Sequence, residues 1–542
     1  MTIEELPPGE TVCDLCVVGS GPVGMALALE FERLGREVLV LESGAAEVNT
    51  SVAEASRAKI EDPRRHADMA LTVCRALGGT SWTWGGRCVG FDDVDFLDRG
   101  FVSDAHWPVT HNDLRPWYKP ASKYLLCGDD TFAIPYPRKL TEGLTLDFVE
   151  RWSREPRLIL VHRDALLRSQ LIRISLRSTV TGLSLTNDGQ AVESLHVASP
   201  NGPRTVRARQ VILATGGVET TRLLLHFQRS HPQHFGGIDG PLGRYYMGHL
   251  SGKIASIQFQ DKDVFRNLDY TLDTTGAFYR RRFMLTTDAQ IQNCVLNTAF
   301  WPDNPPFYDP RHRSGVLSAV FLALAFPPTG RRLLSEAIRL AHTGPRPYNL
   351  AGHLRNAFVG APRGAVDIYR ILRDRFLRNP RKPGFLVRNP GHRYALHFHA
   401  EQVPNPSSRI CLTDETDAFG VYRASIDLRF TSQDVDSVMK SHRLLDRAIR
   451  ANGIGRLDYW DSDEKTREHV WETASDGFHQ VGTTRMGEDP KRSVVDPDLK
   501  VHGLSNLYVA SSSVFPTTGQ ANSTALAVAF AMRLANRLAG AR

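Results

Sequence analysis

Three glycines and an acidic residue near the start of the chain have the types and spacing of a nucleotide-binding site. The glycines are Gly19, Gly21 and Gly24, and Glu42 follows Gly24 by eighteen residues. In this spacing the first glycine makes a tight turn, the second lets a pyrophosphate approach the backbone, and the third lets a helix pack closely on a strand. A carboxylate at Glu42 can accept hydrogen bonds from a ribose diol, which favours FAD or NAD over NADP.

The surrounding sequence predicts the elements that position these residues. Leu15–Val18 and Val38–Leu41 are short apolar runs, and the segment between them carries apolar residues at helical spacing. Glycine-rich turns are common, so a plain βαβ turn is the alternative to a dinucleotide site. The complete order of strand, glycine turn, helix, strand and acid favours the dinucleotide site, because the helix N-terminus then offers free N–H groups to the phosphates.

Two further stretches indicate contact with a ligand. Arg75–Arg87 (RALGGTSWTWGGR) has four glycines in thirteen residues and fits neither a helix nor a regular strand. Gln210–Gly217 is expected to be a buried strand ending in glycines, which is where an open α/β sheet binds ligands. Between them, Leu158–Val161, Ile172–Val180 and Val192–Ala198 have strand-like composition and predict a small antiparallel meander.

Length, composition and charge limit the classes of protein. The chain has 542 residues, 42% of them hydrophobic and 23% charged, which predicts a globular protein of more than one domain. Between residues 331 and 382, twelve Lys or Arg face three Asp or Glu; this net +9 leaves −2 for the rest, since the whole chain carries +7. This basic stretch is either a solvated helical face or a docking surface for a subunit, an acidic partner or a membrane. No nucleic-acid recognition motif accompanies it.

The positions of the cysteines predict no metal site, and the lengths of the apolar runs predict no membrane span. Of seven cysteines only Cys13 and Cys16 lie close together, and on a strand their offset places them on opposite faces. We therefore expect no metal, iron–sulfur centre or haem. The first residues lack a secretory signal pattern, and the apolar run Gly315–Phe326 is too short to cross a bilayer. We expect a cytoplasmic protein, with attachment through a partner subunit left open.

The second half of the chain changes character. Residues 252–300 and 385–430 show strand-like alternation, and the basic stretch lies between them. His397 and His399 point the same way if Ala395–Glu401 is a strand, either as ordinary sheet residues or as part of a substrate cavity. After about residue 470 the α/β pattern returns and ends in an apolar helix, Ala525–Leu538.

Several segments, taken in order, resemble the GMC (glucose–methanol–choline) flavin oxidoreductases. They are the N-terminal fingerprint, GGTSWTWGG, VILATGGVETTRLL, LGRYYMGH, EQVPNPSSRI, HQVGTTRMG and VVDPDLKVHGLSNLYVASSSVFPTTGQANST. Residues from about 260 to 385 match the family poorly. GGTSWTW and QANST are most similar to the pyranose oxidase and glycoside 3-oxidase branch.

The resemblance implies a mixed α/β (α+β) fold with two domains. A Rossmann-like FAD-binding domain is expected from residues 1–250 and 470–542, discontinuous in sequence. A substrate-binding domain is expected from residues 251–469, built on a mostly antiparallel sheet flanked by helices. The basic helical insertion at about 331–382 falls within it.

The resemblance also implies FAD, bound noncovalently, because Thr83 stands where covalent-flavin members carry a histidine. A second departure is Ser511, where many members have an aspartate. The implied cofactor-binding residues are Gly19, Gly21, Pro22, Val23, Gly24, Glu42, Ser43, Gly78, Gly79, Thr80, Ser81, Thr83, Trp84, Gly85, Gly86, Val180, Ala214, Thr215, Gly216, Ser511, Ser512, Asn522, Ser523 and Thr524.

His479 matches the family's catalytic histidine, and Asn522 matches its partner, which is His or Asn across the family. A base of near-neutral pKa beside the flavin can take the hydroxyl proton of an alcohol while hydride leaves carbon. An asparagine amide can hold the substrate oxygen without competing for that proton. We add His397, His399 and Gln402 as candidate substrate residues.

These inferences predict FAD-dependent oxidation of a secondary alcohol of a sugar or glycoside, at pyranose C2 or C3, to a ketone. The electron acceptor is oxygen or another acceptor, so both oxidase and dehydrogenase remain open. One alternative is an aromatic-ring monooxygenase, since GSGPVGMALALE resembles the start of that family, although its later GDAAH-type segment is missing. Another is an FAD subunit of a multi-component dehydrogenase. A homo-oligomer or a partner subunit docking through residues 331–382 is a further possibility.

Overall fold

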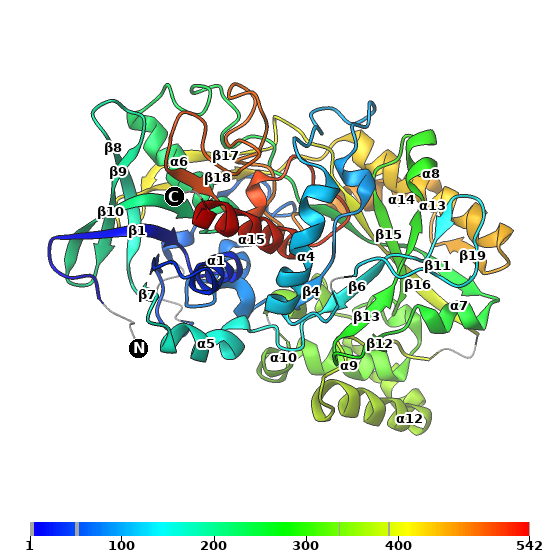
Figure 1. The fold of residues 1–542 in the computed structure, drawn as a ribbon. Coiled ribbons are helices and arrows are strands. Elements are labelled where there is room, and N and C mark those ends of the chain that lie inside the picture. The colour runs from blue at the N-terminus through cyan, green and yellow to red at the C-terminus, as the bar shows by residue number, and fades with distance from the viewer. Residues whose placement is uncertain (1–4, 49–53, 130, 335, 389–390, 541–542) are drawn as a thin grey trace.

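The main sheet of the protein carries the N-terminal fingerprint. The computed structural model describes residues 5–48, 54–129, 131–334, 336–388 and 391–540 (Figure 1). Its seven-stranded sheet has the order β7–β2–β1–β10–β9–β8, with β20 paired to β10. The strands are β1 (Glu10–Val18), β2 (Val38–Leu41), β7 (Ile172–Ser175), β8 (Thr179–Leu185), β9 (Val192–Ser199), β10 (Gly202–Leu213) and β20 (Leu507–Val509). Strands β7, β2, β1, β10 and β20 run parallel, whereas β9 pairs antiparallel with β8 and β10.

The glycine turn after β1 has the geometry that its sequence predicts. Gly19 has φ +99°, in the left-handed region. Helix α1 (Pro22–Arg33) begins two residues after Ser20 with a proline in its first turn. A Cβ on Gly24 would lie 1.9 Å from the carbonyl oxygen of Gly19, so only glycine lets the helix approach the turn this closely.

Helices and loops near this sheet differ from the predicted pattern in two places. Leu158–Val161 is not a strand but the first turn of helix α5 (Leu158–Arg168). Leu158 and Ile159 are buried while Leu160 and Val161 are exposed, a division that fits a helix and not the alternation of a strand. The stretch predicted as Ile172–Val180 is divided between β7, parallel to β2, and β8, antiparallel to β9. On the other side of α1, helix α15 (Thr524–Gly540) packs against α1 and α4 (His111–Leu125).

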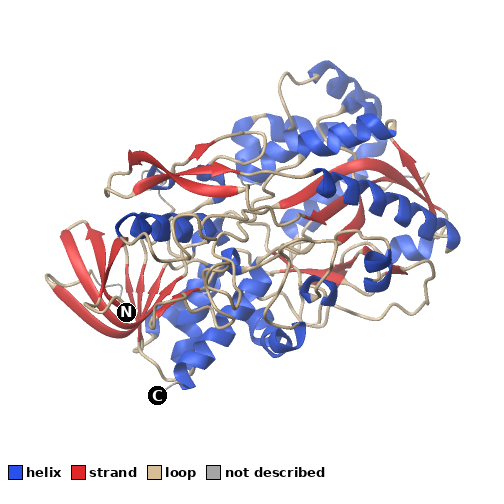
Figure 2. Cartoon of the chain, turned by 90° about the horizontal axis from the view of Figure 1, so that it is seen from above, coloured by secondary structure: helices blue, strands red, loops and turns tan. Residues whose placement is uncertain are grey.

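A second large sheet is antiparallel throughout and lies at the other end of the molecule (Figure 2). Its order is β19–β11–β16–β15–β14–β5. Its strands are β5 (Leu144–Thr145), β11 (His249–Phe259), β14 (Phe283–Leu285), β15 (Thr298–Asp303), β16 (Arg393–Glu401) and β19 (Gly455–Tyr459). Helices α13 (Ser432–Ala451) and α14 (Asp463–Thr473) pack against this sheet. The strand expected at Ala395–Glu401 is confirmed within β16.

Two small sheets lie beside the large ones. One has four strands in the order β12–β13–β6–β4, and the other has three in the order β17–β18–β3. Their strands are β3 (Lys59–Ile60), β4 (Arg87–Cys88), β6 (Val149–Trp152), β12 (Thr271–Leu272), β13 (Phe278–Arg281), β17 (Arg409–Thr416) and β18 (Tyr422–Asp427). The fold class is therefore mixed α/β, with mixed and antiparallel sheets, as predicted.

The basic stretch is helical. It follows α9 (Gly315–Ala325) and includes α11 (Glu336–Thr343) and α12 (Leu350–Leu372), with α10 (Pro327–Leu333) at its start. The other α-helices of the described residues are α3 (Met69–Thr72), α6 (Gly217–Ser230), α7 (Lys262–Asn267) and α8 (Thr287–Gln292). None of the helices in the described ranges combines the length and the apolar character needed to cross a membrane.

Candidate active site

A cavity of about 380 Å³ lies where the parallel strands of the main sheet end. The residues that follow β1, β2, β10 and β20 all line it, because parallel strands end at the same edge of a sheet. The cavity therefore joins parts of the chain that are up to about five hundred residues apart. His479 and Asn522 line the same cavity.

Most of the predicted site residues line this cavity. Those that do, besides His479 and Asn522, are Gly19, Gly21, Pro22, Val23, Glu42, Ser43, Gly79, Thr80, Thr83, Trp84, Gly85, Val180, Ala214, Thr215, Gly216, Ser511, Ser512, Ser523 and Thr524. Those that do not are Gly24, Gly78, Ser81, Gly86, His397, His399 and Gln402. Gly24 packs on Gly19, and the Ser81 hydroxyl donates a 2.6 Å hydrogen bond to the Gly78 carbonyl, so both act behind the cavity wall.

The strand ends fit the dinucleotide half of FAD. A Cβ on Gly21 would meet no atom of the protein within 4 Å, so the backbone there faces open space. Gly21 also precedes α1 without any side-chain cap, which leaves the N–H groups of the first turn available to a phosphate. Glu42 is held by Ser20 N–H at 2.9 Å and Gly44 N–H at 2.7 Å. The Ser20 hydroxyl at 2.6 Å and the Ser43 hydroxyl at 3.4 Å also donate to this carboxylate, which fixes it at the cavity wall. A ribose diol would take the place of one of these donors, the long contact from Ser43 being the weakest.

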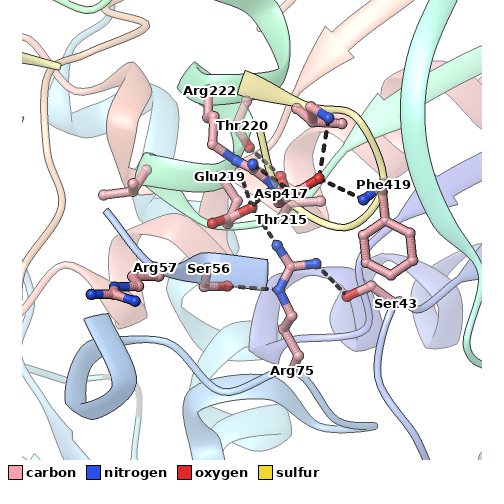
Figure 3. A network of polar contacts seen from close by, with 12 residues as sticks. Ser43, Ser56, Arg57, Arg75, Thr215, Glu219, Thr220, Arg222, Asp417 and Phe419 are labelled. Carbon is pink, nitrogen blue, oxygen red and sulfur yellow. Dashed lines mark hydrogen bonds and ion pairs between the residues drawn. The ribbon is translucent and has the colours of Figure 1, made fainter. Parts of the chain in front are cut away.

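A network of charged side chains connects Ser43, Arg75 and Glu219, all of which line the cavity (Figure 3). Arg75 donates to Ser56 Oγ at 2.6 Å, Ser43 Oγ at 3.1 Å and Glu219 Oε2 at 2.7 Å. Glu219, in the first turn of α6, also accepts from Arg222, which in turn pairs with Asp417 at 2.9 Å. The network ties the loop at residue 75 to α6 and to the β17–β18 connection, and it fixes Ser43 where the cavity ends.

His479 is the middle member of a chain of three hydrogen-bonded side chains. Its Nδ1 is 2.8 Å from Nδ1 of His249, and its Nε2 is 2.9 Å from Nδ2 of Asn522. The Asn522 amide can only donate through Nδ2, so Nε2 of His479 is the acceptor and carries no proton. The proton of His479 is then on Nδ1 and is donated to His249. His399 stacks on His249 with ring centroids 4.4 Å apart.

Burial keeps this cluster neutral. The pKa of His479 is lowered to about 4, first by burial and then by the positive charge of Arg87. Burial also lowers the pKa values of His249 and His399 well below the ordinary range. His479 is therefore an unprotonated base at neutral pH. One ring nitrogen from each of the three histidines lies within 4.8 Å of the other two, a spacing compatible with a metal ion. Hydrogen bonds also hold these rings, since Nδ1 of His399 contacts the Gln520 carbonyl at 2.7 Å.

Arg87 brings positive charge to the same end of the cavity. Its Nε donates to Glu150 Oε2 at 2.6 Å, and Arg280 donates to the other oxygen of Glu150 at 2.6 Å. Two arginines thus share one carboxylate, which leaves a net positive charge. Both guanidinium groups lie over the ring of Trp301, 4.6 and 4.9 Å from its centroid. The sequence offered one signal for Arg87, its place directly after the second glycine pair.

The remaining candidate substrate residues have other partners. His397 accepts or donates a 2.9 Å hydrogen bond with Ser251 Oγ and stacks on Trp301. The Gln402 amide accepts from Gly248 N–H at 2.8 Å and donates to the Arg429 carbonyl at 2.9 Å. Both ends of Gln402 are therefore occupied, whereas His399 belongs to the histidine cluster behind His479.

His249 is the residue that sequence reasoning left without a role. It ends the quoted segment LGRYYMGH and begins β11. Its position is set by pairing of β11 with β16, in which His249 faces Glu401 and Ser251 faces His399. This register brings two histidines, 150 residues apart in the sequence, to the back of His479.

A glycine-rich sheet edge beside a histidine–amide pair is typical of oxidoreductases that use a nucleotide cofactor. Comparison of the chain with protein families narrows the class. Residues 14–237 match the FAD binding domain family, and residues 404–531 match the GMC oxidoreductase family. The chain belongs to the GMC oxidoreductases: it is an FAD-dependent enzyme of the family that acts on CH–OH groups. This outcome confirms FAD as the cofactor and disfavours the aromatic monooxygenase.

Individual relatives are distant. The chain is 26% identical to 6'''-hydroxyparomomycin C oxidase of Streptomyces lividus, over 98% of this chain and 93% of that protein. It is 36% identical to a C-glycoside 3-oxidase of Arthrobacter globiformis, over 23% of this chain and 22% of that protein. The solved structure of pyridoxine 4-oxidase from Mesorbium loti has a similar fold, with a TM-score of 0.54 and 17% identity, over 97% of this chain and 99% of that one.

Proposed function

We propose that this enzyme oxidises a secondary hydroxyl of a sugar or glycoside, at pyranose C2 or C3, to a ketone. The observation that carries the proposal is the pair of His479 and Asn522 at the cavity wall, in which the unprotonated Nε2 of His479 accepts from the Asn522 amide. When bound, FAD supplies the hydride acceptor, N5 of its isoalloxazine ring.

His479 is the general base. The substrate hydroxyl donates its proton to Nε2 of His479 as hydride leaves the carbon that bears this hydroxyl. The alcohol thereby loses two electrons and two hydrogens and becomes a ketone. The substrate oxygen takes the place of the direct contact between Nε2 and Asn522 Nδ2, donating to the first and accepting from the second. His249 holds the ring so that Nε2 is the basic nitrogen, because it accepts the Nδ1 proton.

Positive charge favours the developing alkoxide. Arg87 lines the cavity with His479 and already lowers the pKa of that histidine. A positive group that disfavours protonation of the base in the free enzyme stabilises negative charge on the substrate oxygen during reaction. The pKa of about 4 keeps Nε2 of His479 unprotonated throughout the neutral range, and it makes His479 a weaker base than the near-neutral one expected from the sequence.

A buried acceptor supports a substrate with neighbouring hydroxyls. Asn522 Oδ1 is buried and has no hydrogen-bond partner among the described residues. Such atoms are rare in native proteins, since leaving them unpaired costs about 1–3 kcal/mol. A hydroxyl on the carbon next to the oxidised one can donate to Oδ1 while the reacting oxygen accepts from Nδ2. A pyranose ring provides this pair of hydroxyls at C2 and C3.

The remaining assignments belong to the same proposal. FAD is held noncovalently by the predicted residues that line the cavity, with Gly21 at the pyrophosphate and Glu42 at the ribose. Residues 1–250 and 470–542 form the FAD-binding domain, and residues 251–469 form the substrate domain. Support comes from the sheets: the main sheet uses strands from residues 10–213 and 507–509, and the antiparallel sheet uses strands from 249–459 together with β5.

A second candidate is oxidation at C6 of the sugar. It is favoured by the relative that covers nearly the whole chain, which is named for a 6'''-hydroxy compound. A C6 hydroxyl is primary, so its oxidation gives an aldehyde. The two candidates share the site and the base and differ in which carbon faces the hydride acceptor.

An anaerobic reduction assay with deoxy sugars separates the candidates. Purified enzyme with bound FAD is mixed with glucose, its 2-, 3- and 6-deoxy analogues and the corresponding glycosides, and bleaching of the flavin is followed by stopped flow. Oxidation at C2 or C3 predicts that the 6-deoxy analogue bleaches the flavin and that a ketone is recovered. If the 6-deoxy analogue fails to bleach the flavin while the 2- and 3-deoxy analogues still do, the oxidised carbon is C6. Readmission of oxygen then shows whether the enzyme is an oxidase.

The base is tested by His479→Ala. We expect the variant to retain FAD and to lose alcohol-dependent bleaching by at least 10²-fold, the low end of what general-base catalysis contributes. Bleaching at the wild-type rate would remove His479 from the mechanism and leave the class of enzyme unchanged.

A further inference from the structure

Helix α12 has apolar surface on two opposite sides. Its inner side is fixed to α9: a Cβ on Gly315 would lie 2.8 Å from Cα of Gly360, so the two helices touch backbone to backbone. His353 adds to this contact, stacking on Phe321 at 3.9 Å and bonding Ser318 Oγ and the Tyr308 carbonyl at 3.1 Å each. The inner side of α12 is therefore packed against α9.

The outer side is apolar and exposed. Leu354, Phe358, Ala365, Tyr369 and Leu372 follow one another at helical spacing and share one face. Phe358 is 85% exposed, Tyr369 62% and Leu354 59%. In Figure 1, α12 lies at the rim of the molecule, beyond α9, with no element outside it. A helix that is apolar on both sides and covered on only one has surface left for a partner.

Cationic side chains border this face. Arg355 and Arg370 are exposed on α12, and Arg373 is exposed directly after its end, within the stretch of residues 331–382 that has a net charge of +9. The three acids of the stretch already pair with arginines from within it: Glu336 with Arg331 and Arg339, Asp367 with Arg370, and Asp374 with Arg373. Arg332, Arg355, Arg378 and Arg381 have no acidic partner among the described residues. The positive charge of these four arginines is therefore available to an anionic partner outside the chain.

We propose that the outer face of α12 docks on an anionic membrane surface, with the helix lying in the plane of the lipid–water interface. An interfacial helix combines an apolar face with Lys or Arg and carries aromatic side chains at the boundary, and α12 has all three features. The basic stretch matches the negative potential of anionic lipids, which reaches charges within a Debye length of the surface.

The same charge disfavours a second copy of the chain as the occupant. A two-fold contact through α12 would place two stretches of +9 against each other, and like charges across an interface oppose association. The face is also the outer side of one protruding helix rather than a groove, and a flat lipid surface is the partner whose shape such a helix fits. Docking through α12 leaves the sheet edge that holds the cavity free.

The test is vesicle binding by the full-length holoenzyme. Sedimentation with sucrose-loaded vesicles of phosphatidylcholine and phosphatidylglycerol in equal parts is compared with vesicles of phosphatidylcholine alone. We expect binding to the anionic vesicles only, weakened by added salt. The double variant Leu354→Glu/Phe358→Glu should bind at least tenfold less. Arg355→Gln should lower the affinity roughly fivefold, the effect of about one basic residue near an anionic surface.

Matched controls separate docking from folding. Ile238 is 78% exposed in a turn outside α12, so Ile238→Glu adds one negative charge at an exposed apolar position and should leave binding unchanged; it is compared with the single variant Phe358→Glu, at a position 85% exposed, which should weaken binding. Flavin content of all variants should equal that of the wild type. Light scattering of the free protein measures its oligomeric state and so tests whether a second copy of the chain binds to α12. A dimer that dissociates in Leu354→Glu/Phe358→Glu would overturn the proposal in favour of a second copy. Absence of vesicle binding, or binding that survives the double variant, would also overturn it.

Discussion

Replacing His249 tests how the active-site base is prepared. His249 accepts the Nδ1 proton of His479 at 2.8 Å, inside a cluster where all three histidines are buried. In His249→Phe a ring remains to stack on His399, but the acceptor is lost. The Nδ1 proton is then unpaired just as the ring of His479 gains charge. A buried donor without a partner costs about 1–3 kcal/mol, so we expect the rate of flavin reduction to fall roughly 5- to 150-fold.

The assay is anaerobic stopped-flow reduction of the bound flavin over a range of substrate concentrations. Because His249 does not line the cavity, the limiting rate should fall while the apparent substrate dissociation constant stays close to the wild-type value. His249→Asn keeps an acceptor at the same distance along the side chain and should recover most of the lost rate. This rescue distinguishes a hydrogen-bond acceptor from a residue that only fills space.

A matched control is His442→Phe. His442 is buried, bonds the Val438 carbonyl at 2.7 Å and contacts Phe300 and Phe398 at the antiparallel sheet. Its replacement removes a buried histidine hydrogen bond elsewhere and should leave flavin reduction unchanged. Two results would refute the reasoning: a wild-type rate in His249→Phe, or equal rates in His249→Phe and His249→Asn.

Three further predictions follow from the cavity. Arg87→Gln removes a cation that lowers the pKa of His479, so that pKa should rise from about 4 and the acidic limb of the pH–rate profile should move to higher pH; an unmoved limb would contradict the coupling. Gly24→Ala should lower the melting temperature of the protein, because overpacking costs about 1–3 kcal/mol or more. Gly21→Ala should leave the apoprotein as stable as before and weaken FAD binding, because its added methyl group projects into open space. Thermal shift measures the stability of both variants, and flavin titration measures their affinity for FAD. Acid precipitation should release the yellow cofactor into the supernatant; colour retained in the pellet would disprove noncovalent binding.

Local pattern was sufficient where the contacts are local. The turn at Gly19, the packing of Gly24 and the position of Glu42 after β2 all lie within about thirty residues, and the structure has them as predicted. The apolar run Leu158–Val161 shows the limit of this reasoning. Four apolar residues fit a strand or a helix, and only the core against which Leu158 and Ile159 pack decided for the helix.

The sequence by itself determined the cofactor motif, the order of the family segments and the charge of residues 331–382, since these depend on residue types and their spacing. The tertiary structure alone decided which residues meet. Pairing of β11 with β16 places His249 and His399 behind His479, and pairing of β4 with β6 places Arg87 beside Glu150. The tertiary structure also determines that one apolar side of α12 packs against α9 and that the other is exposed. Burial and register are properties of the assembled chain, so the partners of a base, its pKa and the surface left uncovered cannot be read from spacing.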